Sequence, residues 1–155
     1  MGYSNYYYCA ESYDKSLFSK VVNDFKKIIP SLNELGIYLG DAFGRHQAII
    51  NNDRITFNGR GEQANETFEL VREMRKIPEW KKRPDSQVNG LIFESTKTSH
   101  KRYDLAVQIC LIIAKEHFKD QIMVNSDGDI LNWTEAKKLC QSILGYGFNF
   151  KLDVY

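Results

Sequence analysis

The segment Ser95–Phe118 constrains the fold more than any other part of this chain, because it ends in an almost uninterrupted apolar run. Nine of the ten residues from Leu105 to Ala114 are apolar. A helix that is apolar on nearly every side is typical of a protein interior, where other elements cover all of its faces. We therefore expect a central, buried helix against which the other elements pack.

The residues before this helix are cationic and rich in hydroxyl groups, a combination that suits phosphate or carboxylate. The free N–H groups of a helix N-terminus attract anions, whereas cations at that end are unfavourable unless an anion is bound. The sequence thus predicts an anion-binding site whose residues are Lys97, Thr98, Ser99, Lys101, Arg102 and Tyr103. The alternative is a solvated loop in which Ser or Thr caps the helix. Tyr103 in turn could border an aromatic ligand or belong to the core.

A second segment, Asn58–Glu62, could reach the same ligand. It is rich in glycine but lacks the spacing of a P-loop, and no helix clearly follows it, so a hairpin turn is the default interpretation. Asn58 and Arg60 are nevertheless candidate ligand-binding residues.

Acid–base catalysis stays open, because His100 lies close in sequence to two carboxylates, Glu94 and Asp104. No motif for a covalent nucleophile is present. The three histidines show no metal-binding spacing, and Ser126–Asp129 predicts a turn because no acidic residue completes a calcium loop. We expect neither a metal nor another cofactor.

Composition limits the classes of partner. The 155 residues predict one domain, residues 1–155, and the formal net charge of +1 argues against a long nucleic acid. No secretion signal or membrane-spanning run is recognisable, so we expect a cytoplasmic protein without a membrane partner. Three cysteines without a CxxC pair indicate reduced core thiols. Homo-oligomerisation stays open.

Periodicity and turn residues predict the remaining elements. An amphipathic helix carries its apolar stripe from Leu17 to Ile29 and ends at Pro30, and the final helix is capped by Asn132 with Glu135 and closed by Gly145. The expected strands are residues 3–9, 36–39, 47–50, 54–57, 66–71, 91–94, 121–124 and 146–155. A long surface loop covers residues 72–90. The order predicts an α+β fold with a mainly antiparallel sheet of about five to six strands and three principal helices, one of them central and buried.

Several short stretches between residues 54 and 135 resemble a family of small bacterial and phage α+β proteins of unknown function. They are Phe57-Asn58-Gly59, Glu66-Thr67-Phe68, Lys97-Thr98, Tyr103-Asp104-Leu105-Ala106-Val107, and Ser126-Asp127-Gly128 before Trp133. The resemblance implies no catalytic residue. It implies that Asn58, Lys97, Thr98, Tyr103 and Asp127 are neighbours around one site.

These observations favour a protein that binds a small anionic ligand, a nucleotide or a nucleotide-derived signal. In a phage, such a protein would sequester a host defence signal. One alternative is a hydrolase of phosphoester or glycosidic bonds that uses His100 with a carboxylate. Another is a protein-binding inhibitor or adaptor that uses the loop 72–90 with Trp80 as its anchor.

Overall fold

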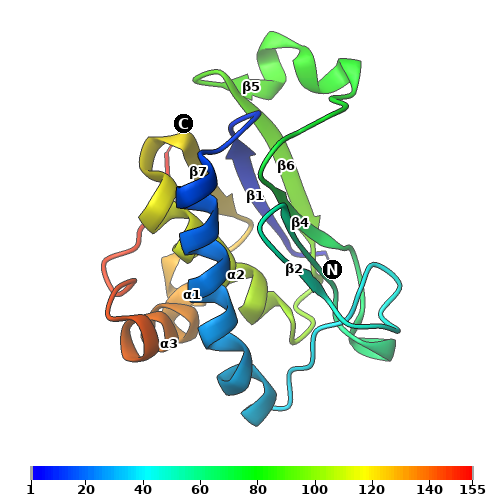
Figure 1. Cartoon of the computed structure of the whole chain (residues 1–155), viewed down its shortest axis with the longest axis vertical. Coiled ribbons are helices and arrows are strands. Elements are labelled where there is room, and N and C mark those ends of the chain that lie inside the picture. Colours follow the sequence, from blue (N-terminus) through cyan, green and yellow to red (C-terminus); the bar gives the residue numbers. More distant parts are fainter. Residues whose placement is uncertain (1, 155) are drawn as a thin grey trace.

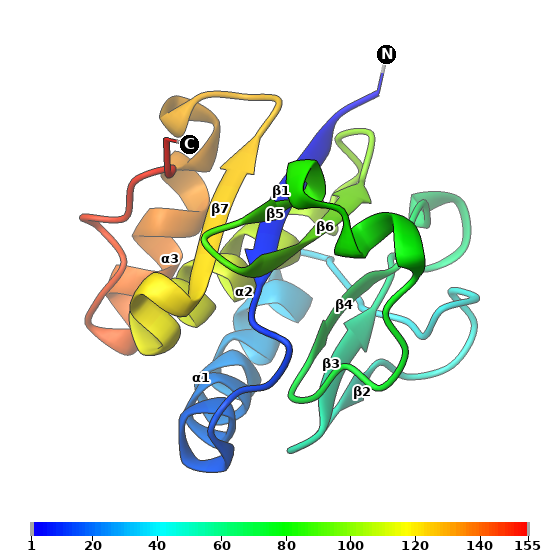
Figure 2. The same ribbon diagram turned by 90° about the horizontal axis from the view of Figure 1, so that it is seen from above.

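The computed structural model, which describes residues 2–154, is an α+β fold with three α-helices and two antiparallel sheets. The helices are α1 (Lys15–Glu34), α2 (Asp104–Phe118) and α3 (Thr134–Leu144). The larger sheet has the strand order β5 (Gln87–Val88), β6 (Leu91–Lys97), β1 (Ser4–Cys9), β7 (Ile122–Ser126). The smaller sheet has the order β2 (Ile49–Ile50), β3 (Arg54–Phe57), β4 (Phe68–Val71). The predicted fold class is confirmed, but the strands are divided between two sheets, with the helices gathered on one side (Figures 1 and 2).

Helix α2 is the buried centre of the fold, as its apolar run predicted. Every residue from Ala106 to Ala114 is buried, and α2 packs against α1, α3 and β7. Helix α1 presents to the core the apolar stripe that its spacing of three and four residues predicted. The buried residues of this stripe are Phe18, Val21, Val22, Phe25, Ile28 and Leu32.

Helix α1 continues beyond Pro30, where the sequence predicted its end. Proline lacks the N–H that would bind the carbonyl of Lys26. Lys26 and Pro30 both lie on the exposed face of α1, where water can solvate that carbonyl. Leu32, one turn after Ile28, is fully buried, so core packing extends the helix to Glu34.

The predicted β-meander is confirmed as the smaller sheet. Its first hairpin turns at residues 51–53, where the Asn51 side-chain oxygen accepts the N–H groups of Asp53 and Arg54 at 2.9 and 3.0 Å. The strand predicted at residues 36–39 is wrong. Gly36 has a φ of +80° and turns the chain sharply as it leaves α1. Pairing with other segments occurs only at Gly40, which forms isolated bridges with Gln47 and Asn58.

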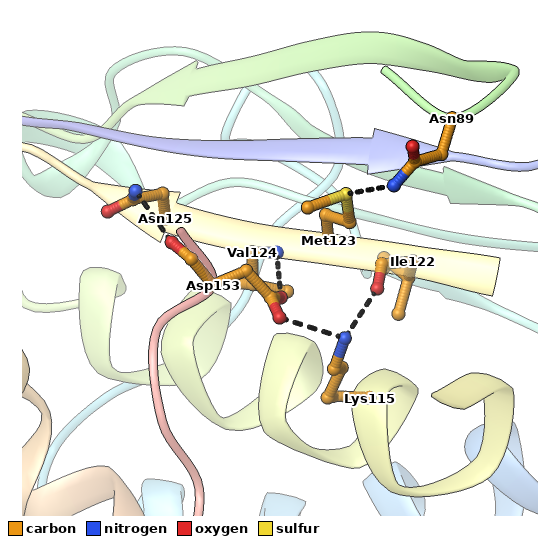
Figure 3. A network of polar contacts seen from close by, with 7 residues as sticks. All are labelled: Asn89, Lys115, Ile122, Met123, Val124, Asn125 and Asp153. Carbon is orange, nitrogen blue, oxygen red and sulfur yellow. Dashed lines mark hydrogen bonds and ion pairs between the residues drawn. The ribbon is translucent and has the colours of Figure 1, made fainter. Parts of the chain in front are cut away.

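The strand predicted at residues 146–155, of which residue 155 lies outside the described residues, is also wrong. Gly147 has a φ of +112° and accepts the N–H of Phe150 at 3.0 Å, so a turn interrupts the extended backbone. The segment still runs to the edge of the larger sheet (Figure 3), where the Asp153 N–H donates to the Val124 carbonyl at 2.8 Å. Of the alternating apolar residues, Phe150 belongs to the core and Tyr146 and Leu152 pack against it, whereas Phe148 and Val154 are exposed.

The long connection predicted at residues 72–90 is present and carries two short 3-10 helices, Glu79–Lys82 and Pro84–Ser86, before β5. Strand β6 begins where expected but extends to Lys97, so the cationic segment starts within a strand. The start of α3 differs from the prediction as well. A 3-10 helix, Ile130–Trp133, precedes α3, and its N-cap is Asp129, with Asn132 completing the capping box.

The three cysteines, Cys9, Cys110 and Cys140, are buried free thiols. Burial raises the pKa of Cys9 and of Cys140 to about 12. Between residues 2 and 154, no helix combines the length and apolarity needed to cross a membrane. The same residues include no group of three or more His, Cys, Asp or Glu side chains placed to hold a metal ion.

Candidate functional site

The cationic segment before α2 forms a tight turn, which directs its residues to different surroundings. The Lys101 N–H donates to the Thr98 carbonyl at 3.0 Å, and both residues between them, Ser99 and His100, have positive φ. The Thr98 side chain is fully buried, and the His100 ring lies on Tyr3 with the ring centroids 4.0 Å apart. The turn therefore makes the Thr98 side chain inaccessible to a ligand that binds from solvent.

Asp104, the first residue of α2, is the centre of a buried hydrogen-bond network. Its carboxylate accepts from Asn5 at 2.7 Å, from Thr98 at 2.6 Å and from Gln108 at 3.1 Å. Burial raises the pKa of Asp104, although the hydrogen bonds and the nearby His100 oppose the shift. These contacts give Asp104 a structural role in joining α2 to β1.

The three candidate acid–base residues have separate partners. Glu94 accepts from Lys81 at 2.6 Å in a partly buried ion pair, and Asp104 is bound by the buried network. Within residues 2–154, no hydrogen bond or ion pair joins His100 to Glu94 or Asp104. The candidate catalytic group is thus not assembled as a hydrogen-bonded unit.

Asn58 is buried and holds a loop closed. Its side-chain oxygen accepts the N–H groups of Gly59 and Asn65 at 2.8 and 2.9 Å, and its amide nitrogen donates to the Asn65 carbonyl at 2.7 Å. The loop from Asn58 to Asn65 includes Arg60 and Gln63. Asn58 therefore acts on a site indirectly, by fixing the loop that carries these side chains.

Three of the predicted residues do meet, at a cleft between the C-terminal end of α1, the smaller sheet and the start of α2. The cleft has a volume of about 760 Å³, and Arg60, Arg102 and Tyr103 all line it. Its other lining residues are Ile29, Asn33, Gly36, Ile37, Tyr38, Leu39, Gln47, Ala48, Ile50, Gly59 and Gln63. We call it the arginine cleft. The remaining predicted residues, Lys97, Thr98, Ser99, Lys101 and Asn58, lie outside its lining.

Backbone carbonyls hold both arginines in place. Arg102 donates to the carbonyl of Leu35, and the Arg60 Nε donates to the carbonyl of Leu39 at 3.2 Å. Within the described residues, neither guanidinium forms an ion pair with a carboxylate. Each guanidinium has five N–H donors, so both keep donors and a full positive charge for a ligand.

The rest of the cleft is apolar or uncharged. Ile29, Ile37 and Ile50 contribute aliphatic surface, and the side chain of Tyr38 is 57% exposed at the cleft. Gln63 accepts the backbone N–H of Arg102 at 3.3 Å, which leaves its amide nitrogen as a donor. An apolar surface with a few polar groups and two fixed cations suits a planar, anionic small molecule.

Four polar residues of the cleft were missed by sequence reasoning: Asn33, Tyr38, Gln47 and Gln63. They come from the end of α1, two irregular segments and a short helical turn, so no local spacing connects them. Only the tertiary structure, which brings these segments together, identifies the four residues as part of one cleft.

No protein-family model matches the chain, and comparison with curated proteins and with solved structures gave no match either. The family resemblance of the short stretches therefore stays a prediction, and the arginine cleft is the basis for a functional proposal.

Proposed function

We propose that this protein binds a small anionic ligand with a planar, nucleotide-like part in the arginine cleft. The observation that carries the proposal is the convergence of Arg60 and Arg102, neither paired with a carboxylate among the described residues, on one largely apolar cleft. Both arginines are exposed, so their guanidinium groups are accessible to an anion that enters the cleft from solvent and can hold it through forked hydrogen bonds.

The positions of the polar groups suggest how such a ligand would lie. Its phosphate or carboxylate would accept N–H groups from Arg60 and Arg102, which match planar anions in a forked geometry. The planar part would contact the aliphatic surface and the Tyr38 ring. The side-chain amides of Asn33, Gln47 and Gln63 offer both donors and acceptors to the edge of a base.

The size of the cleft supports a small molecule rather than a polymer. Its volume of about 760 Å³ lies within the range of roughly 300–1,000 Å³ that is usual for small-ligand pockets. The balanced charge of the chain also provides little of the long-range attraction on which nucleic-acid affinity depends.

The chemistry of the cleft supports retention of the ligand rather than its turnover. Its lining residues, all within the described part of the chain, include no Asp, Glu, His, Cys or Lys, and of its two tyrosines, Tyr38 and Tyr103, the second donates its hydroxyl to the Glu66 carbonyl. Retention without turnover is what the sequestration of a nucleotide-derived defence signal would require.

The test is a thermal-shift screen with mononucleotides, cyclic oligonucleotides and ADP-ribose derivatives. A ligand at 100 times its dissociation constant should stabilise the folded state by about 2.7 kcal/mol. We expect the shift to disappear in Arg60→Ala and to weaken in Arg102→Lys, which keeps the charge but loses the forked geometry. Chromatography of the recovered ligand should show it unchanged.

Two matched controls make the screen specific. Arg45→Ala and Lys101→Ala each remove one cation that does not line the cleft, so both variants should keep the full shift. A ligand shift that survives in Arg60→Ala, or that is lost in Lys101→Ala, would place binding elsewhere and overturn the proposal.

A further inference from the structure

A second cleft is lined by residues of both sheets and of the connection that carries the two 3-10 helices. Figure 2 shows how this connection leads from β4 of the smaller sheet to β5 and β6 of the larger one. Its volume is about 660 Å³, and Glu69 and Val71 of β4 line it together with Ile92 and Glu94 of β6. We call it the inter-sheet cleft. It shares no lining residue with the arginine cleft.

The edge of β4 in this cleft carries backbone groups without a partner. The Arg72 N–H donates to the Asp53 carbonyl at 2.9 Å, so Arg72 points its N–H toward β3. Because backbone groups alternate along a strand, those of Glu69 and Val71 point away from β3. The Glu69 carbonyl accepts from the Tyr7 hydroxyl at 3.1 Å. Among the described residues, the Glu69 N–H and both backbone groups of Val71 have no partner.

Other parts of the chain already cover this edge on both sides of the cleft. Beyond Val71, the Tyr13 N–H donates to the Arg72 carbonyl at 2.8 Å and the Met74 N–H donates to the Glu11 carbonyl at 2.8 Å. Before Phe68, the Glu66 N–H donates to the Lys97 carbonyl at 3.2 Å. The stretch Glu69–Val71 is thus a short unpaired part of this edge. On both sides of it, other segments of the chain already form backbone hydrogen bonds with the edge.

The charges of the cleft indicate which segment would fill this interruption. Each carboxylate that lines it is paired with a cation: Glu69 with Arg54, Glu94 with Lys81, and Asp53 and Glu73 with Arg72, at distances from 2.6 to 3.8 Å.

Two further cations, Arg75 and Lys76, also line the cleft. Both are exposed, and within residues 2–154 neither forms an ion pair. Met74 and Ile77, which flank these two cations in the chain, add apolar surface to the cleft. The unpaired charge available to a partner is therefore positive.

We propose that the inter-sheet cleft binds a short, extended, acidic segment of a partner protein by strand addition to the edge of β4. The segment would hydrogen-bond the free backbone groups of Glu69 and Val71. Its carboxylates would pair with Arg75 and Lys76, and its apolar side chains would contact Met74 and Ile77. This proposal is independent of the ligand proposed for the arginine cleft.

The experiment uses the full chain and a blocked pentapeptide of alternating glutamate and valine, with its lysine–valine counterpart as the control peptide. Binding is followed by NMR through the backbone amides of Glu69 and Val71. We expect both resonances to shift with the acidic peptide and not with the lysine peptide. The reversed-charge variant Arg75→Glu/Lys76→Glu should lose affinity for the acidic peptide.

A proline substitution tests the backbone contact. Val71→Pro removes an N–H that points away from β3, so it leaves the β3–β4 ladder intact, whereas Val71→Ala keeps that N–H. Val71→Pro should bind the acidic peptide roughly fivefold to tenfold more weakly than Val71→Ala, which is the effect of one hydrogen bond. Equal binding by these two folded variants would overturn the proposal. So would equal binding of both peptides, unshifted Glu69 and Val71 amides, or full affinity in the reversed-charge variant.

Discussion

The guanidinium of Arg102, which precedes α2, donates a hydrogen bond to the carbonyl of Leu35, the residue at the end of α1. The contact places a cation at the negative end of the α1 dipole. It also accounts for part of the positive charge before α2, for which the sequence predicted an anion site, with a solvated loop as the alternative. One arginine thus connects the end of one helix to the start of another and lines the arginine cleft between them.

Arg102→Ala should lower the free energy of unfolding by about 1 kcal/mol, because it removes both a helix-dipole contact and a hydrogen bond. Arg102→Lys should lose less, since the charge remains. Urea denaturation measures both values. Lys101→Ala, at the neighbouring position, should stay within about 0.5 kcal/mol of the unmodified protein. Equal losses in Arg102→Ala and Lys101→Ala would show that the contact with Leu35 contributes nothing.

The sequence predicted the elements whose pattern is set by local periodicity. The apolar run at Leu105–Ala114 and the stripe of α1 both formed buried helices, and Asn51–Asp53 formed the expected hairpin turn. In each case the pattern that determines the element lies within one continuous stretch of chain, so contacts with distant residues did not alter the predicted element.

The wrong predictions share a different cause. Pro30 was expected to end α1, but its position on the exposed face makes the lost hydrogen bond inexpensive, and the burial of Leu32 extends the helix. Residues 146–154 alternate like a strand, but the turn at Gly147 prevents a ladder. The first outcome depends on which face of the helix meets the core, and the second on the backbone conformation that Gly147 adopts; neither is set by the local apolar pattern.

The candidate site could be predicted only in part. Arg60 and Arg102 were recognised by charge, and both line the arginine cleft. Thr98 was predicted to contact ligand because it is polar, but its hydroxyl serves the buried carboxylate of Asp104. When a segment forms an irregular turn, its sequence does not reveal which polar side chains face solvent and which are buried.

Asp104 should make stability depend on pH in the direction opposite to most carboxylates. Its pKa is raised in the folded state by burial, so the unfolded chain loses this proton first. The stabilising contribution is complete below the unfolded pKa of about 4 and is lost as the pH rises through the folded pKa. The unmodified protein should therefore lose free energy of unfolding relative to Asp104→Asn as the pH rises from 4. A difference that is constant over this range would contradict a raised pKa.

Asp24 should show the usual direction. Burial acts to raise its pKa, but hydrogen bonds that the carboxylate accepts from Tyr146 at 2.7 Å and from His117 at 2.8 Å, with the charge of Lys27, hold it below the ordinary value. Its stabilising contribution is present above the unfolded pKa of about 4 and is lost as the pH falls through the folded pKa.

Asp24→Asn should therefore cost stability at pH 7 and cost less below pH 3, as measured by urea denaturation over that range. Tyr146→Phe removes one of the two hydrogen bonds and should produce a smaller change with the same pH profile. A loss that is independent of pH would mean that Asp24 contributes through packing alone.

Asp153 should be the most sensitive position of the C-terminal segment, because four contacts converge on it. Figure 3 shows those that its oxygen atoms accept. Its carboxylate accepts from Lys115 at 3.1 Å and from the Val124 N–H at 2.8 Å, and its own N–H donates to the Val124 carbonyl. Its carbonyl accepts from Asn125 at 3.0 Å. The residue thus covers the outer edge of β7, which ends the larger sheet.

Asp153→Ala should lower the free energy of unfolding by about 2 kcal/mol, because it leaves the partly buried Lys115 without its ion-pair partner and frees the Val124 N–H. Asp153→Asn keeps an oxygen for Val124 and should lose roughly half as much. An uncovered strand edge can also pair with another chain. Sedimentation velocity should therefore detect self-association of the alanine variant at a lower protein concentration than that of the asparagine variant. A monomeric alanine variant of unchanged stability would mean that β7 is protected by its neighbours in the C-terminal segment and not by Asp153.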